Sequence, residues 1–228
     1  VLEVDLDDMN PIEAVQFITA NGTLPADRAL KDVVGEKDYE RVARLASTLG
    51  VPELAIAKLE PWAAALILTQ FAINKTGFDP QLGIDMQIAE RAKADGKPVD
   101  GLETVIDQLS VFDNRTLEEQ TRFLLDSTDD AVNLDEDLAK LVTAWRQGDM
   151  RALEKEFEQE RAKSPELYDA LLGARNRNWM PKLEALLESE QDHLVVVGTL
   201  HFVGEDGLLT LLQEQGFKAV PLPAAAKR

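Results

Sequence analysis

The sequence predicts an α/β fold, with a small, mostly parallel central sheet and large, dominant helical insertions. Three short segments have the apolar character of strands, and the two stretches of about ninety residues between them have the periodicity of helices. Strands joined in this way are expected to be parallel, because parallel strands need long crossover connections. The length of 228 residues favours a single domain over residues 1–228, with residues 104–190 as a helical insertion within it.

The predicted sheet contains three strands and a short edge strand. Val1–Leu6 alternates apolar and acidic residues, and Pro98–Leu102 is the second strand. Leu194–Leu200 is apolar at nearly every position, as expected of a strand buried on both faces. Phe217–Leu222 is predicted to lie at an edge, because Pro221 has no amide hydrogen to donate to a neighbouring strand.

The helices are predicted from apolar periodicity and from residues that start and stop helices. Thr116-Leu117-Glu118-Glu119 has the S/T-x-x-E form of a capping box, so a helix is expected to begin there. The helix Pro61–Asn74 is apolar around almost its whole circumference, and such a helix is buried or pairs with another subunit. Further helices are expected at Asp38–Leu49, at Ile84–Asp95, from Asp149, from Ser164, up to Glu190 and at Leu208–Gln215.

The charge balance and the residue counts exclude several classes of site and partner. The chain has 24 Lys and Arg against 42 Asp and Glu, a net charge of −18 that repels nucleic acid. It has no cysteine, which excludes disulfides, thiolate metal sites and cysteine nucleophiles. Only two histidines are present, His193 and His201, so this chain alone cannot build a three-histidine metal centre.

The chain opens in the middle of a predicted strand. Val1 stands inside an apolar alternation, with no methionine and no signal peptide before it. We therefore expect that residues are missing before Val1, and a targeting sequence could be among them. The longest apolar run, Trp62–Ile73, is shorter than the roughly 20 residues of a membrane span, so no transmembrane segment is expected.

Polar side chains lie on or directly after the three predicted strands. Glu3 and Asp5 share one face of the first strand, Glu103 follows the second and His201 ends the third. Ligands bind beyond the carboxyl ends of the strands in an open parallel sheet, so these side chains are expected to converge. Two or three carboxylates and one imidazole could hold a metal ion, or act as a general acid and base on water.

Each of these residues also has a purely structural explanation. His201 could be a loop residue after its strand, and Glu103 could be the neighbour of an N-cap at Thr104. Glu3 and Asp5 could form the solvated face of an edge strand. The residue pattern alone leaves these alternatives open.

Four other prominent residues are assigned no function. His193 precedes its strand and is predicted to lie on the surface. Trp62, Trp145 and Trp179 occupy helical positions and are predicted to be core residues rather than stacking platforms.

The C-terminal segment Val195–Leu209 resembles the C-terminal signature of the TraB/PrgY/GumN family. That family is related to the Tiki metalloproteases and, more distantly, to ChaN-like and erythromycin-esterase-like proteins. Other blocks occur in the expected order along almost the whole chain, at Val1–Leu6, Pro61–Ala64, Gly83–Asp85, Gly96–Thr104, Ala144–Asp149 and Arg175–Trp179. A lone G-x-x-H motif is a weak signal, whereas these blocks together in order are a strong one.

The resemblance implies two G-x-x-H motifs, one near each end of the domain, around a metal ion. Only the second motif is present, at Gly198–His201, and the first belongs in a strand that would precede Val1. We therefore expect residues 1–228 to be N-terminally truncated, to bind metal weakly and to be impaired or inactive. The full-length protein is expected to bind a divalent ion, with Mn, Co and Zn as the candidates.

The resemblance also assigns residues to the site. The catalytic candidates are Glu3, Glu103, Arg175 and His201, and three of these, His201, Glu3 and Glu103, are the candidate metal ligands. Arg175 enters by resemblance alone. Asp85 and Asn176 match the family blocks too, but could equally well hold loops.

Two functions from different classes remain open. In the first, the protein is a metal-dependent hydrolase, with a peptide as the substrate that the Tiki resemblance implies. A carboxylate would then act as base, and Arg175 would stabilise the developing oxyanion. In the second, the protein is a non-catalytic binding or sequestering protein for a peptide or a haem-like ligand.

The expected partners are a peptide or small-molecule substrate and no nucleic acid. Self-association is possible through the helix Pro61–Asn74 or through an open sheet edge. Bacterial members of the GumN branch imply an exported, periplasmic location, with the cytoplasm as the alternative.

Overall fold

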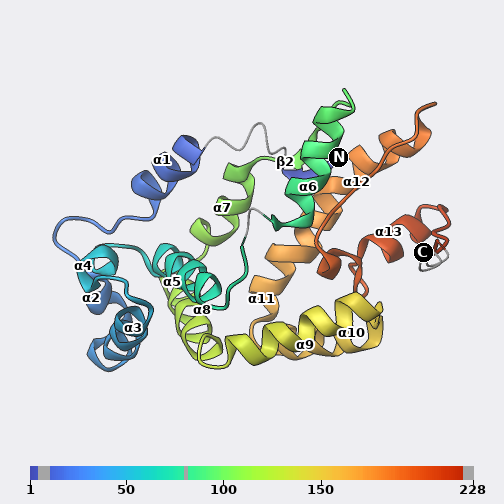
Figure 1. Cartoon of the computed structure of the whole chain (residues 1–228). Coiled ribbons are helices and arrows are strands. Elements are labelled where there is room, and N and C mark those ends of the chain that lie inside the picture. Colours follow the sequence, from blue (N-terminus) through green and yellow to red (C-terminus); the bar gives the residue numbers. More distant parts are fainter. Residues whose placement is uncertain (5–10, 80–81, 223–228) are drawn as a thin grey trace. The chain divides into compact units, whose positions relative to one another are not determined.

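The computed structural model describes residues 1–4, 11–79 and 82–222. The chain divides into two compact units, Val1–Thr143 and Ala144–Arg228 (Figure 1). The elements of the first unit are β1 (Leu2–Val4), α1 (Pro11–Asn21), α2 (Leu30–Val34), α3 (Glu36–Leu49), α4 (Glu53–Ile56), α5 (Pro61–Lys75), α6 (Ile84–Ala94), β2 (Gly101–Glu103), α7 (Val105–Asp113) and α8 (Leu117–Asp130). The remaining elements are α9 (Leu134–Gln147), α10 (Met150–Lys163), α11 (Pro165–Tyr168), the π-helical turn η2 (Asp169–Gly173), α12 (Ala174–Glu188), the 3-10 helix η3 (Thr199–Phe202) and α13 (Leu208–Glu214).

The predicted fold class is confirmed, because a small parallel sheet stands among many helices. β1 and β2 pair in parallel, with Leu2 opposite Gly101 and Val4 opposite Glu103. About a hundred residues of chain separate the two strands, as the crossover argument requires. The predicted first and second strands therefore exist and are neighbours. Residues 5 and 6 of the first lie outside the described residues, and the second spans Gly101–Glu103 rather than Pro98–Leu102.

The core of the first unit is built around α5. This helix lies side by side with α8 and also packs on α3 (Figure 1). The buried cluster combines apolar residues of these three helices, among them Val42, Leu68 and Leu124. The prediction that the apolar helix Pro61–Asn74 is buried is confirmed for most of its length, although Phe71 is 43% exposed.

Two capping boxes fix the starts of α7 and α8. The Thr116 hydroxyl accepts a hydrogen bond from the Glu119 amide at 3.3 Å, and the Glu119 carboxylate accepts one from the Thr116 amide at 2.8 Å. Thr104 and Asp107 make the same reciprocal pair at the start of α7. The capping box at Thr116 is predicted from its S/T-x-x-E spacing, and that prediction is confirmed.

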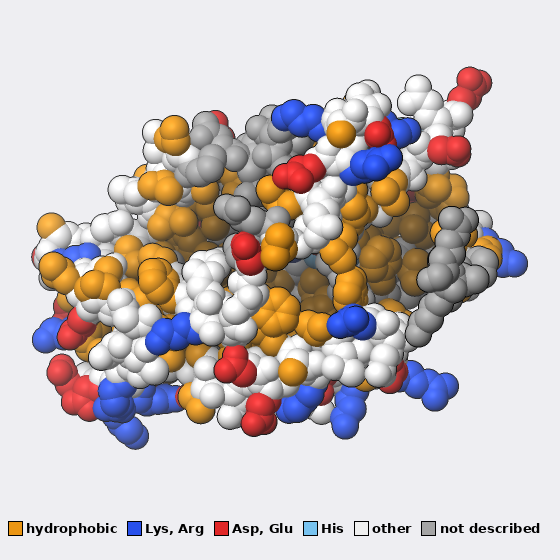
Figure 2. Space-filling view, viewed as in Figure 1, with side chains coloured by type: hydrophobic (Ala, Val, Ile, Leu, Met, Phe, Trp, Pro, Cys, Tyr) orange, Lys and Arg blue, Asp and Glu red, His pale blue; other side chains and the backbone are white. Residues whose placement is uncertain are grey.

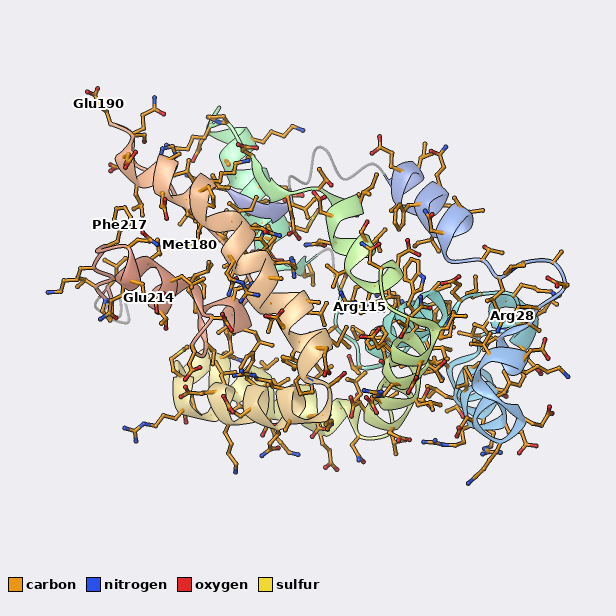
Figure 3. The ribbon with its side chains drawn as sticks, turned by 180° about the vertical axis from the view of Figure 1, so that it is seen from behind. Arg28, Arg115, Met180, Glu190, Glu214 and Phe217 are labelled. Atoms are coloured by element: carbon orange, nitrogen blue, oxygen red, sulfur yellow. The ribbon has the colours of Figure 1, made fainter. Side chains whose placement is uncertain are left out.

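The second unit consists of helices that pack around the short 3-10 helix η3. α10 continues through α11 and the π-helical turn into α12, and the chain then returns as an extended segment to η3 and α13 (Figure 1). α12 packs on α13, and η3 lies against α10, α13 and the π-helical turn. Met180, on α12, is one of the buried residues of this unit (Figure 3).

The prediction of a strand at Leu194–Leu200 is wrong. Within the described residues it carries one bridge position at Val196 and no ladder, and its last residues enter the 3-10 helix. An apolar run does not by itself distinguish a strand from an extended segment, because a strand also needs hydrogen-bonded neighbours. Phe217–Leu222 is likewise not a strand, and its Val220 and Leu222 side chains are exposed.

Two tryptophans and one histidine lie where they were predicted. Trp62 and Trp179 are buried and His193 is exposed, whereas Trp145 is 47% exposed rather than in the core. Acidic and basic side chains are interspersed over the face shown in Figure 2. In the part of the chain that the structure describes, no helix combines the length and the apolar character needed to cross a membrane.

Candidate functional site

The two candidate glutamates of the first unit lie on the parallel strand pair. Val4 is opposite Glu103 and Leu2 is opposite Gly101, so these four residues share one face of the ribbon. Glu3 falls between Leu2 and Val4 and therefore lies on the other face. The structure brings Glu3 and Glu103 onto neighbouring strands, but it directs their side chains to opposite sides of the sheet.

Each glutamate has a defined local setting. The Glu3 carboxylate accepts a hydrogen bond of 3.5 Å from the Gln108 amide of α7. Glu103 ends β2 directly before Thr104, the N-cap of α7, so it is both a strand end and an N-cap neighbour. Asp5 lies outside the described residues, and Asp85 is exposed in the first turn of α6.

His201 lies in the second unit at the end of the G-x-x-H motif. The Gly198 carbonyl accepts a hydrogen bond from the His201 amide at 2.9 Å, which closes a 3-10 turn around the motif. The His201 side chain is 3% exposed. The motif thus holds a buried imidazole on a tight turn rather than at the end of a strand.

Three residues of α12 surround the His201 ring. The Asn176 side-chain oxygen lies 2.6 Å from Nδ1, and the Trp179 ring packs with its centroid 4.4 Å from that of the imidazole. An Arg175 guanidinium nitrogen lies 3.4 Å from Nε2. Residues four apart lie on the same face of a helix, so α12 presents Arg175 and Trp179 together, with Asn176 beside them.

Arg175 is oriented by contacts of its own. Its guanidinium donates a hydrogen bond of 2.8 Å to the Leu171 carbonyl in the π-helical turn. Its central carbon lies 4.9 Å from the centroid of Trp179, within the range of a cation–π contact. The positively charged group is therefore held beside the Nε2 edge of His201.

The loop after His201 is attached to α12 at Asp206. The Asn176 amide nitrogen donates to the Asp206 carbonyl at 2.8 Å and to the His201 carbonyl at 3.1 Å. Arg177 donates to the Asp206 carboxylate at 2.6 Å and to Asp169 at 2.8 Å. The hydrogen bond with Asp169 is the largest of the contacts that raise the pKa of Arg177 above its usual value. Neighbouring residues of α12 thus bind both ends of the segment from His201 to Asp206.

Sequence reasoning found part of this arrangement. His201 and Arg175 were predicted as site residues, and the structure brings them together. Asn176 is only a weaker candidate from the sequence, Trp179 is predicted as a core residue, and no sequence pattern assigns a role to Asp206. The block Arg175–Trp179 was the available signal, since helical spacing places its first, second and fifth residues on one side.

The His201 ring fits the role of one ligand of a divalent metal ion. A metal-binding histidine usually has its second ring nitrogen hydrogen-bonded to a protein oxygen, and the Nδ1 contact with Asn176 matches that pattern. Among residues 1–4, 11–79 and 82–222, however, no group of three His, Asp or Glu side chains is placed to hold a metal ion. The described residues therefore supply one suitable ligand rather than a complete set.

The comparisons with known proteins identify relatives along most of the chain. The TraB/PrgY/gumN family matches residues 1–221. The uncharacterized protein YbaP of Escherichia coli (strain K12) is 28% identical over 200 residues, which cover 86% of this chain and 72% of YbaP. YbaP of Shigella flexneri matches with the same identity and coverage. No solved structure matches the chain.

Proposed function

Because the chain belongs to the TraB/PrgY/gumN family, we propose that it is a metal-dependent hydrolase with His201 as one ligand of the metal ion. The observation that carries this proposal is the setting of His201, a buried imidazole at the G-x-x-H motif with three residues of α12 around it. A divalent ion bound there would polarise a substrate carbonyl or lower the pKa of a bound water. A peptide is the proposed substrate.

The residues of the second unit have distinct roles in this proposal. His201 supplies Nε2, and Trp179 holds the plane of its ring. Arg175 lies on the Nε2 side and carries a permanent positive charge, so it would stabilise negative charge that develops on a substrate oxygen. Glu3 and Glu103 of the first unit remain predictions as ligands or as the base, and their side chains lie on opposite faces of the strand pair.

One observation favours the alternative, a protein that binds a ligand without reaction. The Arg175 guanidinium lies 3.4 Å from Nε2, where its positive charge would repel a metal cation. An arginine stacked on a tryptophan beside an imidazole suits an anionic group, such as the carboxylate of a peptide. An exported, periplasmic location remains a prediction in both cases.

Metal content and turnover distinguish the two functions. A protein that carries both G-x-x-H motifs of the family should bind about one divalent ion per chain, and peptide hydrolysis should stop with chelator and return with Mn, Co or Zn. His201→Ala should abolish both properties. His193→Ala is the matched control, because His193 is exposed and contacts Ser189 rather than the site.

Two results would contradict the hydrolase. Hydrolysis that persists in chelator would exclude the metal, and metal binding that survives His201→Ala would exclude His201 as a ligand. If the protein binds peptides equally well with and without metal and does not cleave them, the binding function replaces the hydrolase.

A further inference from the structure

The Asn176 side chain has only one possible orientation. It is 1% exposed, and its amide nitrogen lies 3.1 Å from the His201 carbonyl oxygen and 2.8 Å from that of Asp206. An amide nitrogen donates hydrogen bonds, and carbonyl oxygens can only accept them. A flipped amide would place its oxygen against two other oxygens and leave buried groups unsatisfied. The nitrogen of Asn176 therefore faces the two carbonyls.

This orientation determines which atom faces the imidazole. The Asn176 oxygen lies 2.6 Å from Nδ1 of His201. An amide oxygen accepts a hydrogen bond and cannot donate one, so Nδ1 must carry the hydrogen. In a neutral imidazole, a hydrogen on Nδ1 leaves the lone pair on Nε2.

We infer that Asn176 is a positioning residue, which selects the Nδ1–H tautomer of His201 and so directs the Nε2 lone pair toward Arg175. Asn176 touches the ring rather than a substrate, so it acts through His201. The positioning role of Asn176 concerns only which nitrogen of the His201 ring carries the hydrogen, so it does not depend on any reaction. Its consequence for metal binding rests on the proposed function, because Nε2 is the nitrogen that would bind the ion.

The opposite edge of the ring supports the same tautomer. The Arg175 guanidinium has only donors, and one of its nitrogens lies 3.4 Å from Nε2. An Nε2–H group would direct a hydrogen at another N–H group, whereas a lone pair at Nε2 suits a donor on that side. The contacts on the two edges of the ring therefore agree, although they come from different residues.

The turn after His201 contributes to this selection. The two carbonyls that orient Asn176 belong to His201 itself and to Asp206, at opposite ends of the turn. Arg177 binds the Asp206 carboxylate from the next position on α12. The turn thus holds the amide of Asn176, and the amide in turn holds the ring.

The second histidine provides an internal comparison. Nε2 of His193 lies 2.7 Å from the Ser189 hydroxyl oxygen, which also lies 2.9 Å from the Leu186 carbonyl and 3.3 Å from the Gln191 carbonyl. A hydroxyl rotates and both donates and accepts, so this neighbour selects neither tautomer of His193. The amide of Asn176 cannot exchange roles in this way, and only the His201 ring is held in one tautomer.

Nuclear magnetic resonance of the imidazole nitrogens tests this directly. The full chain, labelled with 15N-histidine and kept metal-free, gives only two ring systems, because it contains two histidines. At about pH 8, above the ordinary histidine pKa of about 6.5, long-range 1H–15N correlations report which nitrogen carries the hydrogen. His193→Ala assigns the two systems. A His201 ring with hydrogen on Nε2, or on both nitrogens, would overturn the inference.

Two variants of α12 separate positioning from a general effect on folding. Asn176→Ala should release the Nδ1–H tautomer. In a protein that carries both G-x-x-H motifs it should also weaken metal binding about 10- to 100-fold, the usual effect of losing a residue that orients a metal ligand. Asn178→Ala is the control, because Asn178 is exposed on the same helix, and it should change neither property. Circular dichroism confirms that each variant is folded, and the wild-type tautomer decides the question if Asn176→Ala is not.

The outcomes keep this inference distinct from the proposed function. A folded Asn176→Ala protein that retains the Nδ1–H tautomer would refute the role of Asn176, whatever the protein catalyses. The Nδ1–H tautomer in the wild-type chain, together with no metal affinity in a protein that carries both G-x-x-H motifs, would support the role of Asn176 and refute the metal-dependent hydrolase.

Discussion

Replacing Leu68 by Ala should destabilise the first unit by about 3 to 4 kcal/mol. Leu68 is 2% exposed on α5, inside the cluster that α3, α5 and α8 share. The substitution removes three carbon atoms, and at about 0.8 kcal/mol per buried methylene the lost transfer free energy is about 2.4 kcal/mol. A cavity adds to this cost, because the surrounding helices relax only partly.

A matched control is available in the same unit. Leu54, on α4, is 85% exposed, so Leu54→Ala should change the free energy of unfolding by less than about 0.5 kcal/mol. Unfolding in urea can be followed by the fluorescence of Trp62, which is buried on α5. Replacing Trp145 and Trp179 by Phe leaves Trp62 as the only tryptophan of the chain, so the signal reports on the first unit alone.

The comparison of the two leucines decides the argument. If Leu68→Ala and Leu54→Ala lower the urea midpoint equally, with unchanged slopes, α5 is not the centre of a packed core. A changed slope for Leu68→Ala would instead indicate that the two states no longer differ by the same exposed surface.

Two further predictions concern ionisable groups of the first unit. Burial and the hydrogen bond to Glu53 raise the pKa of Tyr39 to about 12, so the folded protein keeps this proton when the unfolded chain has lost it. Stability is then complete below about pH 10 and is lost as the pH rises toward 12, and an alkaline unfolding curve of Tyr39→Phe that matches the wild type would contradict this. Hydrogen bonds from Thr116 lower the pKa of Glu119 below its ordinary value of 4.5, so the stability that they give is present above that pH and is lost as the pH falls through the lowered value. Thr116→Ala should therefore cost about 1 kcal/mol at neutral pH in urea unfolding and less in acid, and an equal cost at both pH values would count against the capping box.

The elements that the sequence predicted correctly are those with unambiguous local signals. The parallel pair of β1 and β2, the buried α5 and the capping box at Thr116 each follow from a pattern with a direct physical meaning. The expected strand at Leu194–Leu200 is reduced to one bridge position at Val196, since Thr199 and Leu200 belong to the 3-10 helix and an apolar run alone does not distinguish a strand from an extended segment.

The candidate site was predicted in its residue types more than in its geometry. The pairing of Arg175 with His201 came from the family resemblance, and the structure places the two 3.4 Å apart. The opposite orientations of Glu3 and Glu103 depend on the strand register, which no single sequence pattern specifies. The role of Asn176 depends on two backbone carbonyls, and backbone groups carry no sequence signal of their own.

The three-residue spacing of the G-x-x-H motif has a physical reason in this unit. A 3-10 turn joins residues three apart, and the Gly198 carbonyl accepts the His201 amide across that interval. If His201 stood in a strand, an amide of a neighbouring strand could donate to its carbonyl. That amide would compete with the Asn176 side chain for the carbonyl. The turn instead leaves this carbonyl to Asn176, whose oxygen then faces Nδ1. The 3-10 turn therefore allows Asn176 to hold His201 at two points, its backbone carbonyl and its imidazole ring.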